Sequence, residues 1–295
     1  MATVLLSIFS LMFFSFAEPL QACASCGSGG DDPMVLYPSE TWKAYIGLSR
    51  AGDFEGVNRD GNTFKEYGPE FRNITLVSFG RSFSPRFFGT VTAPYIVNKR
   101  ERFERSGWGD PLTSLRYTVV QQSLADEMIP QIQLLASFRP GDAPSIYNYE
   151  DPAKLDVRGS GFAETRAGVD LWSGMSSWKY GFAQTFSSPV AGRSTEFGYV
   201  RPGVTYRSTA TFGYGWNQDT KVVTGINREL VTPASIDGTL QPQTDSLQHG
   251  VFVSADTMVE RRTSIRLTAQ RAASLLANRN TNRNQSFSLA MTRSF

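Results

Sequence analysis

Apolar and polar residues alternate along this chain in short runs that predict β-strands. In the clearest run, 85–97, Phe87, Val91 and Tyr95 share one face, while Phe88 and Thr92 share the other. Successive side chains of a strand point to opposite faces, so this spacing gives one apolar and one mostly polar surface. No helical period competes with the alternation at any length.

Similar runs, each about ten residues long, recur from residue 41 to the end of the chain. The face of the run 70–80 is ambiguous, and the run 195–216 could contain a hairpin around Ser208. The predicted strands are 41–51, 70–80, 85–97, 110–122, 130–139, 159–172, 177–187, 195–216, 220–231, 246–257, 262–275 and 284–295.

The connections between these strands are alternately long and short. Bacterial outer-membrane barrels have short periplasmic turns, longer external loops and an even number of strands. The first connection here is long and the chain ends on a strand, so both termini are expected in the periplasm. The pattern predicts an all-β, antiparallel, up-and-down transmembrane barrel of about twelve strands, within a range of ten to fourteen.

A soluble β-sandwich or propeller would also consist of many short strands. Here one face is apolar along most strands and the other carries charges, as a wall between lipid and a water-filled lumen would. The mean hydropathy is −0.26, and no stretch after residue 20 is long and apolar enough for a transmembrane helix. The net charge of +2 argues against a nucleic-acid partner.

The first residues read as an export signal. Residues 4–17 form an almost unbroken apolar run, and small residues follow at Ala22 and Ala24, although no Lys or Arg precedes the run. We therefore expect a signal peptide over 1–22, a flexible periplasmic segment over 23–40 and an outer-membrane barrel over 41–295. A buried core helix is the alternative for the apolar run.

The last strand resembles the terminal signal by which the barrel-assembly machinery recognises outer-membrane proteins. That signal has a terminal aromatic residue preceded by apolar residues at alternate positions, and Arg293 departs from it. The residues that match are Phe287, Leu289, Met291 and Phe295. The resemblance implies insertion into outer-membrane lipid.

Residues 107–117, GWGDPLTSLRY, contain a G-x-G-D element that leads into a strand ending in Arg-Tyr. This element resembles the hairpin between the third and fourth strands of transport-type outer-membrane barrels, a family linked to phenol-degradation clusters and distantly similar to fatty-acid transporters. The resemblance covers about a tenth of the chain. It implies a channel, without room for the N-terminal plug segment of true fatty-acid transporters.

The two cysteines, Cys23 and Cys26, form a C-x-x-C sequence in an oxidising compartment. A haem attachment site would need His where Gly27 stands, and no further soft ligands for a metal lie nearby, so we expect no metal and no cofactor. A disulfide or thiol pair is favoured, and acylation of Cys23, as in a lipoprotein, is the alternative. The sequence also resembles the C-x-x-C of sheath barrels in extracellular electron-transfer conduits.

Enzymatic activity is not expected. His249 is the only histidine, and its position in the alternation places it on the outer face near the external rim. Ser246 and Ser254 lie in the opposite phase, so a Ser–His pair on this strand is not predicted.

Charged residues on the inward face are the main functional signal, because they would line the lumen. They could pair and rigidify the wall, or their excess of arginine could favour anionic solutes, and these two interpretations are compatible. We therefore expect a channel for small solutes. The alternative is a structural barrel that scaffolds a periplasmic redox partner through the C-x-x-C segment. The candidate lumen residues are Arg86, Arg116, Arg139, Glu164, Arg166, Asp170, Arg201, Arg207, Asp256 and Arg266.

Overall fold

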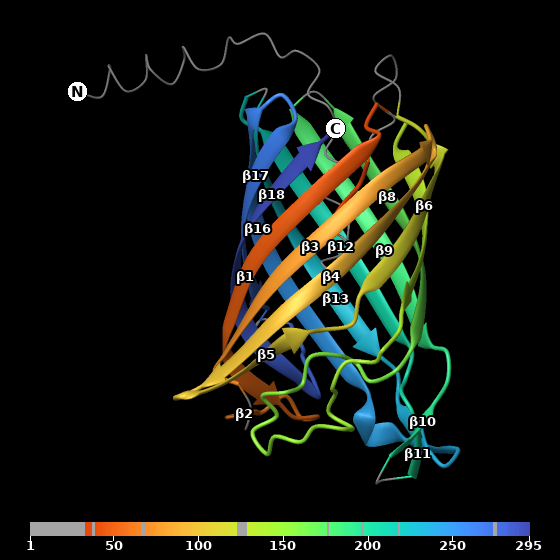
Figure 1. Cartoon of the computed structure of the whole chain (residues 1–295), viewed down its shortest axis with the longest axis vertical. Helices are drawn as coiled ribbons and strands as arrows, with labels where there is room; N and C mark the ends of the chain where they lie inside the picture. Colours follow the sequence, from red (N-terminus) through yellow and green to blue (C-terminus); the bar gives the residue numbers. More distant parts are fainter. Residues whose placement is uncertain are drawn as a thin grey trace, which may run out of the picture.

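The chain forms a closed antiparallel β-barrel of twelve strands in a computed structural model (Figure 1). The predicted fold class and strand number are confirmed. The structure describes residues 33–36, 39–65, 69–122, 129–175, 177–195, 198–217, 219–273 and 276–295. The barrel strands are β1 (Trp42–Val57), β3 (Phe71–Ser84), β4 (Phe87–Arg100), β6 (Leu112–Val120), β7 (Gln131–Arg139), β8 (Glu164–Met175), β9 (Trp178–Pro189), β12 (Thr205–Gly215), β13 (Thr220–Val231), β16 (Ser246–Glu260), β17 (Thr263–Ala272) and β18 (Thr281–Ser294).

The first and last barrel strands close the sheet. Strand β1 pairs with β18 from Lys43 opposite Ser294 to Val57 opposite Thr281, with one register shift. All other barrel strands pair with their neighbours in chain order. No helix in the described ranges is long and apolar enough to cross a membrane.

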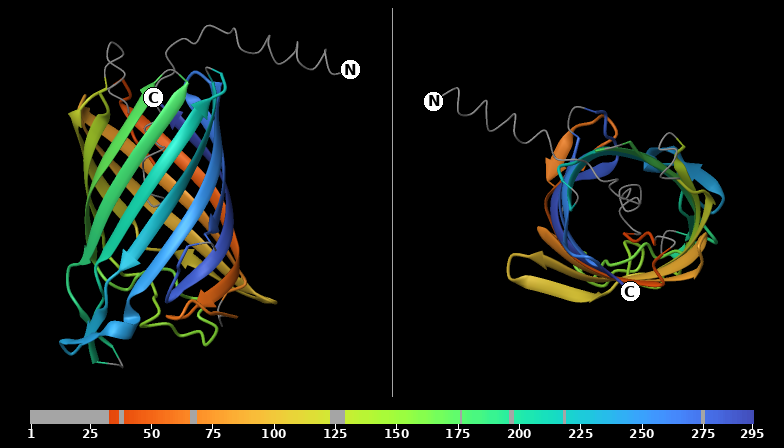
Figure 2. Two further views of the ribbon diagram at one scale, coloured as in Figure 1. Left: turned by 180° about the vertical axis from the view of Figure 1, so that it is seen from behind. Right: turned by 90° about the horizontal axis from the view of Figure 1, so that it is seen from above.

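The two ends of the barrel differ, as the lengths of the connections predict. At one end, here called the turn end, tight turns join the strands, for example at residues 85–86 and 261–262, and β1 starts and β18 ends there. The opposite, loop end carries the long connections, which include the hairpin strand β5 (Phe103–Trp108) and a small four-stranded sheet (Figures 1 and 2). The further short strands are β2 (Thr63–Lys65), β10 (Arg193–Thr195), β11 (Gly198–Arg201), β14 (Ala234–Ile236) and β15 (Thr239–Gln241), and a 3-10 turn spans Pro242–Thr244.

The hairpin considered around Ser208 does not form. Strand β12 runs straight through this residue, which pairs with Gln184 on one side and Arg228 on the other. Residues 195–201 instead belong to the small sheet at the loop end. The boundary between the small-sheet strand and β12 does not show in the sequence. The alternation continues over 195–216 although the two strands belong to different sheets.

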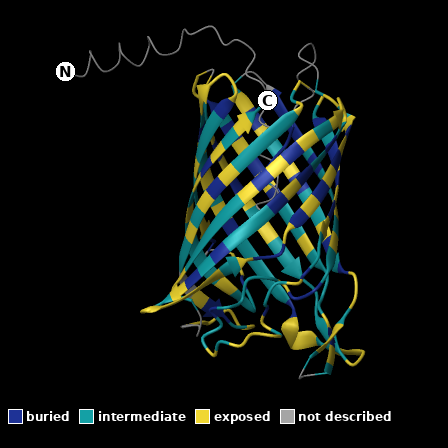
Figure 3. Ribbon diagram, viewed as in Figure 1, coloured by how far each residue is buried: buried dark blue, intermediate teal, exposed yellow. Residues whose placement is uncertain are grey.

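More buried and more exposed residues alternate along most strands of the barrel wall (Figure 3). The outer wall is apolar, with exposed residues such as Val91, Leu134 and Leu267. Aromatic side chains gather on it near the turn end, where Trp178 stacks on Phe212 at 5.1 Å between ring centroids. An apolar band bordered by aromatic side chains is the surface that transmembrane barrels present to lipid.

A charge on the outer wall is expected to destabilise the barrel in a bilayer. Replacing Leu289 of β18 by Arg should lower the free energy of unfolding by about 2–4 kcal/mol, because the charge would enter hydrocarbon. The control is Ser288→Arg, one residue away on the inner wall. Urea titration in lipid vesicles measures both changes, and equal losses would contradict the assignment of the two faces.

Candidate functional site: the lumen

The inner wall carries most of the charged residues that the alternation predicts to face inward. Two predicted residues lie elsewhere: Arg86 is exposed in the β3–β4 turn, and Arg201 is exposed in β11 of the small sheet. Both positions lie just beyond a barrel strand, where the alternation no longer applies. The predicted residues on the inner wall are Arg116, Arg139, Glu164, Arg166, Asp170, Arg207, Asp256 and Arg266.

Towards the turn end, Arg116 of β6 and Asp170 of β8 form a buried ion pair across β7. The Arg116 side chain is only 1% exposed. A buried guanidinium is costly unless a carboxylate compensates it, and removal of one partner from such a pair typically costs 3–5 kcal/mol. This pair therefore fixes the inner wall at this level.

A second charged cluster lies at the loop end of β7 and β8. The Glu164 carboxylate lies 3.1 Å from Nη2 of Arg166 and 3.6 Å from Nη1 of Arg139. One carboxylate thus serves two guanidinium groups, which leaves positive charge in excess here.

Three more ion pairs lie on the wall formed by β12, β13, β16 and β17. Arg207 pairs with Glu229 directly across from it on β13. Asp256 lies 2.7 Å from Arg266 and 3.9 Å from Nζ of Lys221. These pairs agree with the expectation of a cross-linked wall.

Further charged residues face inward although the sequence did not predict it. Arg72 lies in the run 70–80, whose face was ambiguous, and Lys179 and Lys221 each follow the first residue of a strand, where alternation has only begun. Glu229 could have been found from its register opposite Arg207. Among the described residues of the barrel strands, inward-facing cations outnumber inward-facing carboxylates: Lys43, Arg72, Arg116, Arg139, Arg166, Lys179, Arg207, Lys221 and Arg266 against Glu164, Asp170, Glu229 and Asp256.

The β7–β8 loop folds into the loop end of the lumen, inside the ring of strands (Figure 2). Asp110 anchors it by accepting hydrogen bonds from the backbone N–H groups of Ala143, at 2.8 Å, and Ser160, at 3.0 Å. Asn98 donates to the carbonyls of Leu155 and Val157. The loop therefore narrows the lumen as part of its wall.

The G-x-G-D element provides this anchor. A Cβ on Gly109 would lie 2.7 Å from the carbonyl oxygen of Arg158, so a side chain there would displace the loop. Asp110 follows directly and holds the loop. The element lies between β4 and β6, the third and fourth strands of the barrel, as the resemblance implied.

The turn end of the lumen is occupied by residues 33–36 of the N-terminal segment. Met34, Val35 and Leu36 are at most 3% exposed, and Val35 and Leu36 cluster with Phe88 and Trp172 of the inner wall. For these residues the expectation of a flexible lead-in over 23–40 is wrong. Their apolar side chains are buried in the barrel instead. We call Met34–Leu36 the N-terminal plug.

Polar contacts and a glycine fix the position of the N-terminal plug. Lys43 donates from Nζ to the carbonyl of Val35 at 2.9 Å and forms a 3.0 Å ion pair with Glu40. A Cβ on Gly80 would lie 2.7 Å from Cδ1 of Leu36, so this glycine makes room for the plug. The signal in the sequence was the apolar run PMVL inside an otherwise polar segment.

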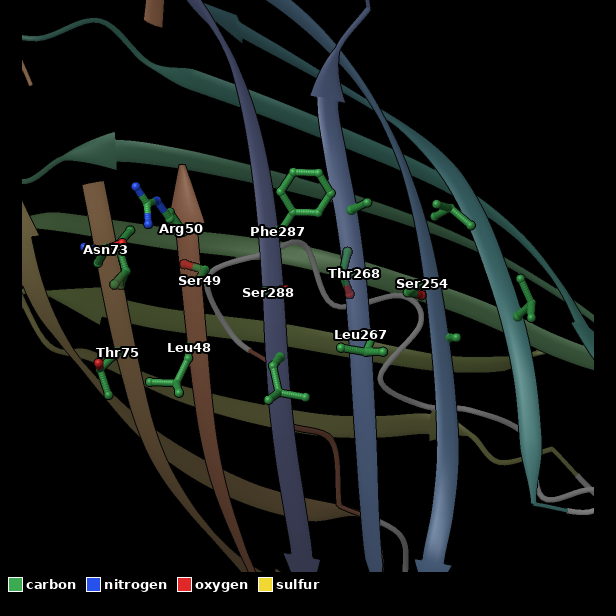
Figure 4. A pocket seen from close by; sticks show the side chains of 16 residues that line it. Leu48, Ser49, Arg50, Asn73, Thr75, Ser254, Leu267, Thr268, Phe287 and Ser288 are labelled. Carbon is green, nitrogen blue, oxygen red and sulfur yellow. The ribbon is translucent and has the colours of Figure 1, made fainter. Parts of the chain in front are cut away.

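A shallow hollow of about 720 Å³ crosses β13, β16, β17, β18, β1 and β3 (Figure 4). Its apolar side chains, including Leu48, Leu267 and Phe287, belong to the exposed outer wall. Arg50 lies at its edge, stacked over the ring of Phe71 at 4.3 Å. The hollow is therefore a feature of the lipid-facing surface and lies apart from the charged lumen.

The remaining sequence candidates lie outside the lumen or outside the described residues. Phe287, Leu289, Met291 and Phe295 are exposed on the outer wall. His249 has its Nδ1 3.0 Å from the carbonyl oxygen of Ala277 in the β17–β18 connection. The segment 1–22 and the cysteines Cys23 and Cys26 are not among the described residues.

Solved structures with a similar fold are outer-membrane channels. An outer-membrane channel from Pseudomonas putida F1 matches with a TM-score of 0.70 at 14% sequence identity, covering 91% of this chain and 99% of the channel. The NanC porin matches with a TM-score of 0.52 at 7% identity, covering 85% and 100%. No protein-family model and no curated protein matches the sequence. The outer-membrane barrel fold implied by the resemblance is confirmed.

The N-terminal plug is expected to limit ion flow. Replacing Met34, Val35 and Leu36 together by Ser should raise the single-channel conductance in planar bilayers, because three serines lose the apolar contacts with Phe88 and Trp172. The control carries Met34→Leu, Val35→Ile and Leu36→Met, which keep the plug apolar. Equal conductance of the serine variant and the control would contradict a blocking role.

Asp110 is expected to keep the β7–β8 loop in the lumen. The variant Asp110→Ala leaves two inward-directed N–H groups without their acceptor, at a cost of about 1–3 kcal/mol for each unsatisfied buried group. Trypsin should then cleave the loop at Lys154 and Arg158 faster than in the wild type. Asp142→Ala, an exposed position in the same loop, is the control, and equal cleavage of both variants would refute the anchoring role.

Proposed function

We propose that this chain is an outer-membrane channel that passes small solutes through the lumen of its barrel. The observation that carries the proposal is the contrast between the two walls. Apolar side chains cover the outside, whereas paired charges and hydroxyl groups cover the inside. A membrane barrel without transport could fill its interior with apolar side chains, whereas a charged inner wall suits water and solutes.

The excess of cations on the inner wall gives this channel a preference for anionic solutes. Many of these cations form ion pairs, which make the wall rigid. The electrostatic potential in the lumen is set by the paired and the excess charges together. Cross-linking of the wall and selection of solutes are thus two consequences of one set of residues.

The turn end faces the periplasm in this proposal, and the long connections face outside. Short periplasmic turns and longer external loops are the arrangement found in outer-membrane barrels. The N-terminal plug then closes the periplasmic end, and the β7–β8 loop narrows the external end.

Membrane insertion in this proposal begins at the terminal strand. Its exposed apolar residues end at Phe295, which suits recognition by the barrel-assembly machinery. The strand also pairs with both β1 and β17, so its insertion completes the barrel.

The alternative is a structural barrel that binds a periplasmic redox partner through Cys23 and Cys26. The two interpretations predict different outcomes. A barrel without conductance in every variant, together with loss of a bound partner in Cys26→Ser, would favour the scaffold and refute the channel.

The charge filter is tested best in a barrel freed of its plug. In the serine variant of residues 34–36, adding Arg166→Gln and Arg207→Gln should shift the reversal potential in a KCl gradient towards that of potassium, because two inward cations are removed. Arg228→Gln, exposed on the outer wall of β13, removes a cation without touching the lumen. The same reversal potential in the serine variant, in its Arg166→Gln/Arg207→Gln derivative and in its Arg228→Gln derivative would rule out selection of anions by Arg166 and Arg207.

A further inference from the structure

A cavity of about 410 Å³ lies within the lumen at the loop end. Inward residues of β3, β4 and β6 form one side, and residues 157–160 of the β7–β8 loop form another. The volume falls in the range of small-molecule sites, about 300–1,000 Å³. The cavity lies beside the fixed loop described above, so its shape depends on the Asp110 anchor.

One side of this cavity is apolar, unlike most of the inner wall. Ile74 of β3 lies opposite Ile96 of β4, and Leu76 lies opposite Pro94. Leu112 of β6 continues the patch. Ile96 and Leu112 are already buried, at 7% and 3% exposed, whereas Ile74 and Leu76 are half-buried and offer apolar surface to the cavity. Covering this surface with an apolar ligand would be favourable.

The other side of the cavity is positively charged. Arg72, Arg139 and Arg158 line it, and Asp110 is the one carboxylate among the lining residues. Both oxygens of Asp110 already accept backbone N–H groups of the loop. The cavity therefore combines three guanidinium groups with a carboxylate that serves to anchor the loop.

The two arginines nearest the loop are held in place by neutral oxygen atoms. Arg72 donates from Nε to Oδ1 of Asn98 at 2.8 Å, and Arg158 donates from Nη1 to the carbonyl of Ser106 at 2.6 Å. The buried Nε of Arg158 has no hydrogen-bond partner in the described part of the chain. A guanidinium group has five N–H donors in a fixed plane, and a carboxylate is the group that matches them best.

We propose that this cavity binds a small organic anion, with its apolar body on Ile74 and Leu76 and its carboxylate at Arg72 and Arg158. The inference deepens the proposed channel function by naming the class of solute that the lumen selects. Both halves of the site contribute: a neutral apolar molecule would not use the guanidinium groups, and a small inorganic anion would not cover Ile74 and Leu76.

Calorimetric titration of the full chain in lipid nanodiscs tests this site with three probes. Benzoate carries both features, benzyl alcohol has the ring without the charge, and acetate has the charge without the ring. Benzoate should bind about tenfold or more tightly than either, because only benzoate can make both the charge-assisted hydrogen bond and the apolar contact. Equal binding of benzoate and benzyl alcohol would overturn the proposal, as would equal binding of benzoate and acetate.

Variants locate the binding within the barrel. Arg72→Met and Arg158→Met should each weaken benzoate binding about tenfold and leave the binding of benzyl alcohol unchanged. Leu76→Ser should weaken benzoate binding without changing that of acetate. The control Arg228→Met removes an exposed cation from the outer wall and should bind benzoate as the wild type does. Unchanged affinity in both arginine variants would place the ligand elsewhere and refute the site.

The binding measurement and the conductance measurement can fail independently. Benzoate binding in a barrel that never conducts would support the site and refute the channel. Conductance without benzoate binding would support the channel and refute this solute class.

Discussion

Closure of the sheet is the constraint on which the rest of this structure depends. In lipid, an unpaired backbone N–H or C=O group costs several kcal/mol, so a sheet can cross a membrane only when its first and last strands pair. The long register between β1 and β18 meets this need. Closure then divides every strand into an outward and an inward set of side chains, which allows one chain to be apolar towards lipid and charged towards its lumen.

Charges inside a closed barrel have few neighbours to compensate them, which explains the arrangement of the ion pairs. Several pairs join strands that are adjacent or next-but-one, as between Arg116 and Asp170 or between Arg207 and Glu229. Each pair therefore ties part of the wall together. Because the carboxylates are fewer, some guanidinium groups share a partner or bond to neutral oxygens, and these are the groups best able to meet an incoming anion.

The barrel could be predicted from the sequence because successive side chains of any single strand point to opposite faces. Eleven of the twelve barrel strands lie close to their predicted positions, and the exception is the run 195–216, of which only Thr205–Gly215 belongs to the barrel. Eight of the ten charged residues expected to face inward lie on the inner wall of the described barrel strands. The failures involve contacts between distant segments. Nothing local shows that the PMVL run would pack on Phe88 and Trp172, or that Asp110 would hold a loop more than thirty residues away in the chain. Arg86 and Arg201 were misplaced because both lie outside the barrel strands, Arg86 in the turn after β3 and Arg201 in β11 of the small sheet.

Because of these long-range contacts, the N-terminal plug and the β7–β8 loop narrow the lumen at its two ends. The side chains of the N-terminal plug pack on apolar groups at the turn end, and one hydrogen bond from Lys43 holds its backbone. The β7–β8 loop is held by hydrogen bonds to a carboxylate and an amide, which makes it a permanent part of the wall. A solute that enters from the loop end therefore meets a fixed, positively charged cavity before it reaches the plug. The cavity that selects solutes and the plug that closes the lumen thus lie at opposite ends of the barrel. A change in one therefore does not require a change in the other.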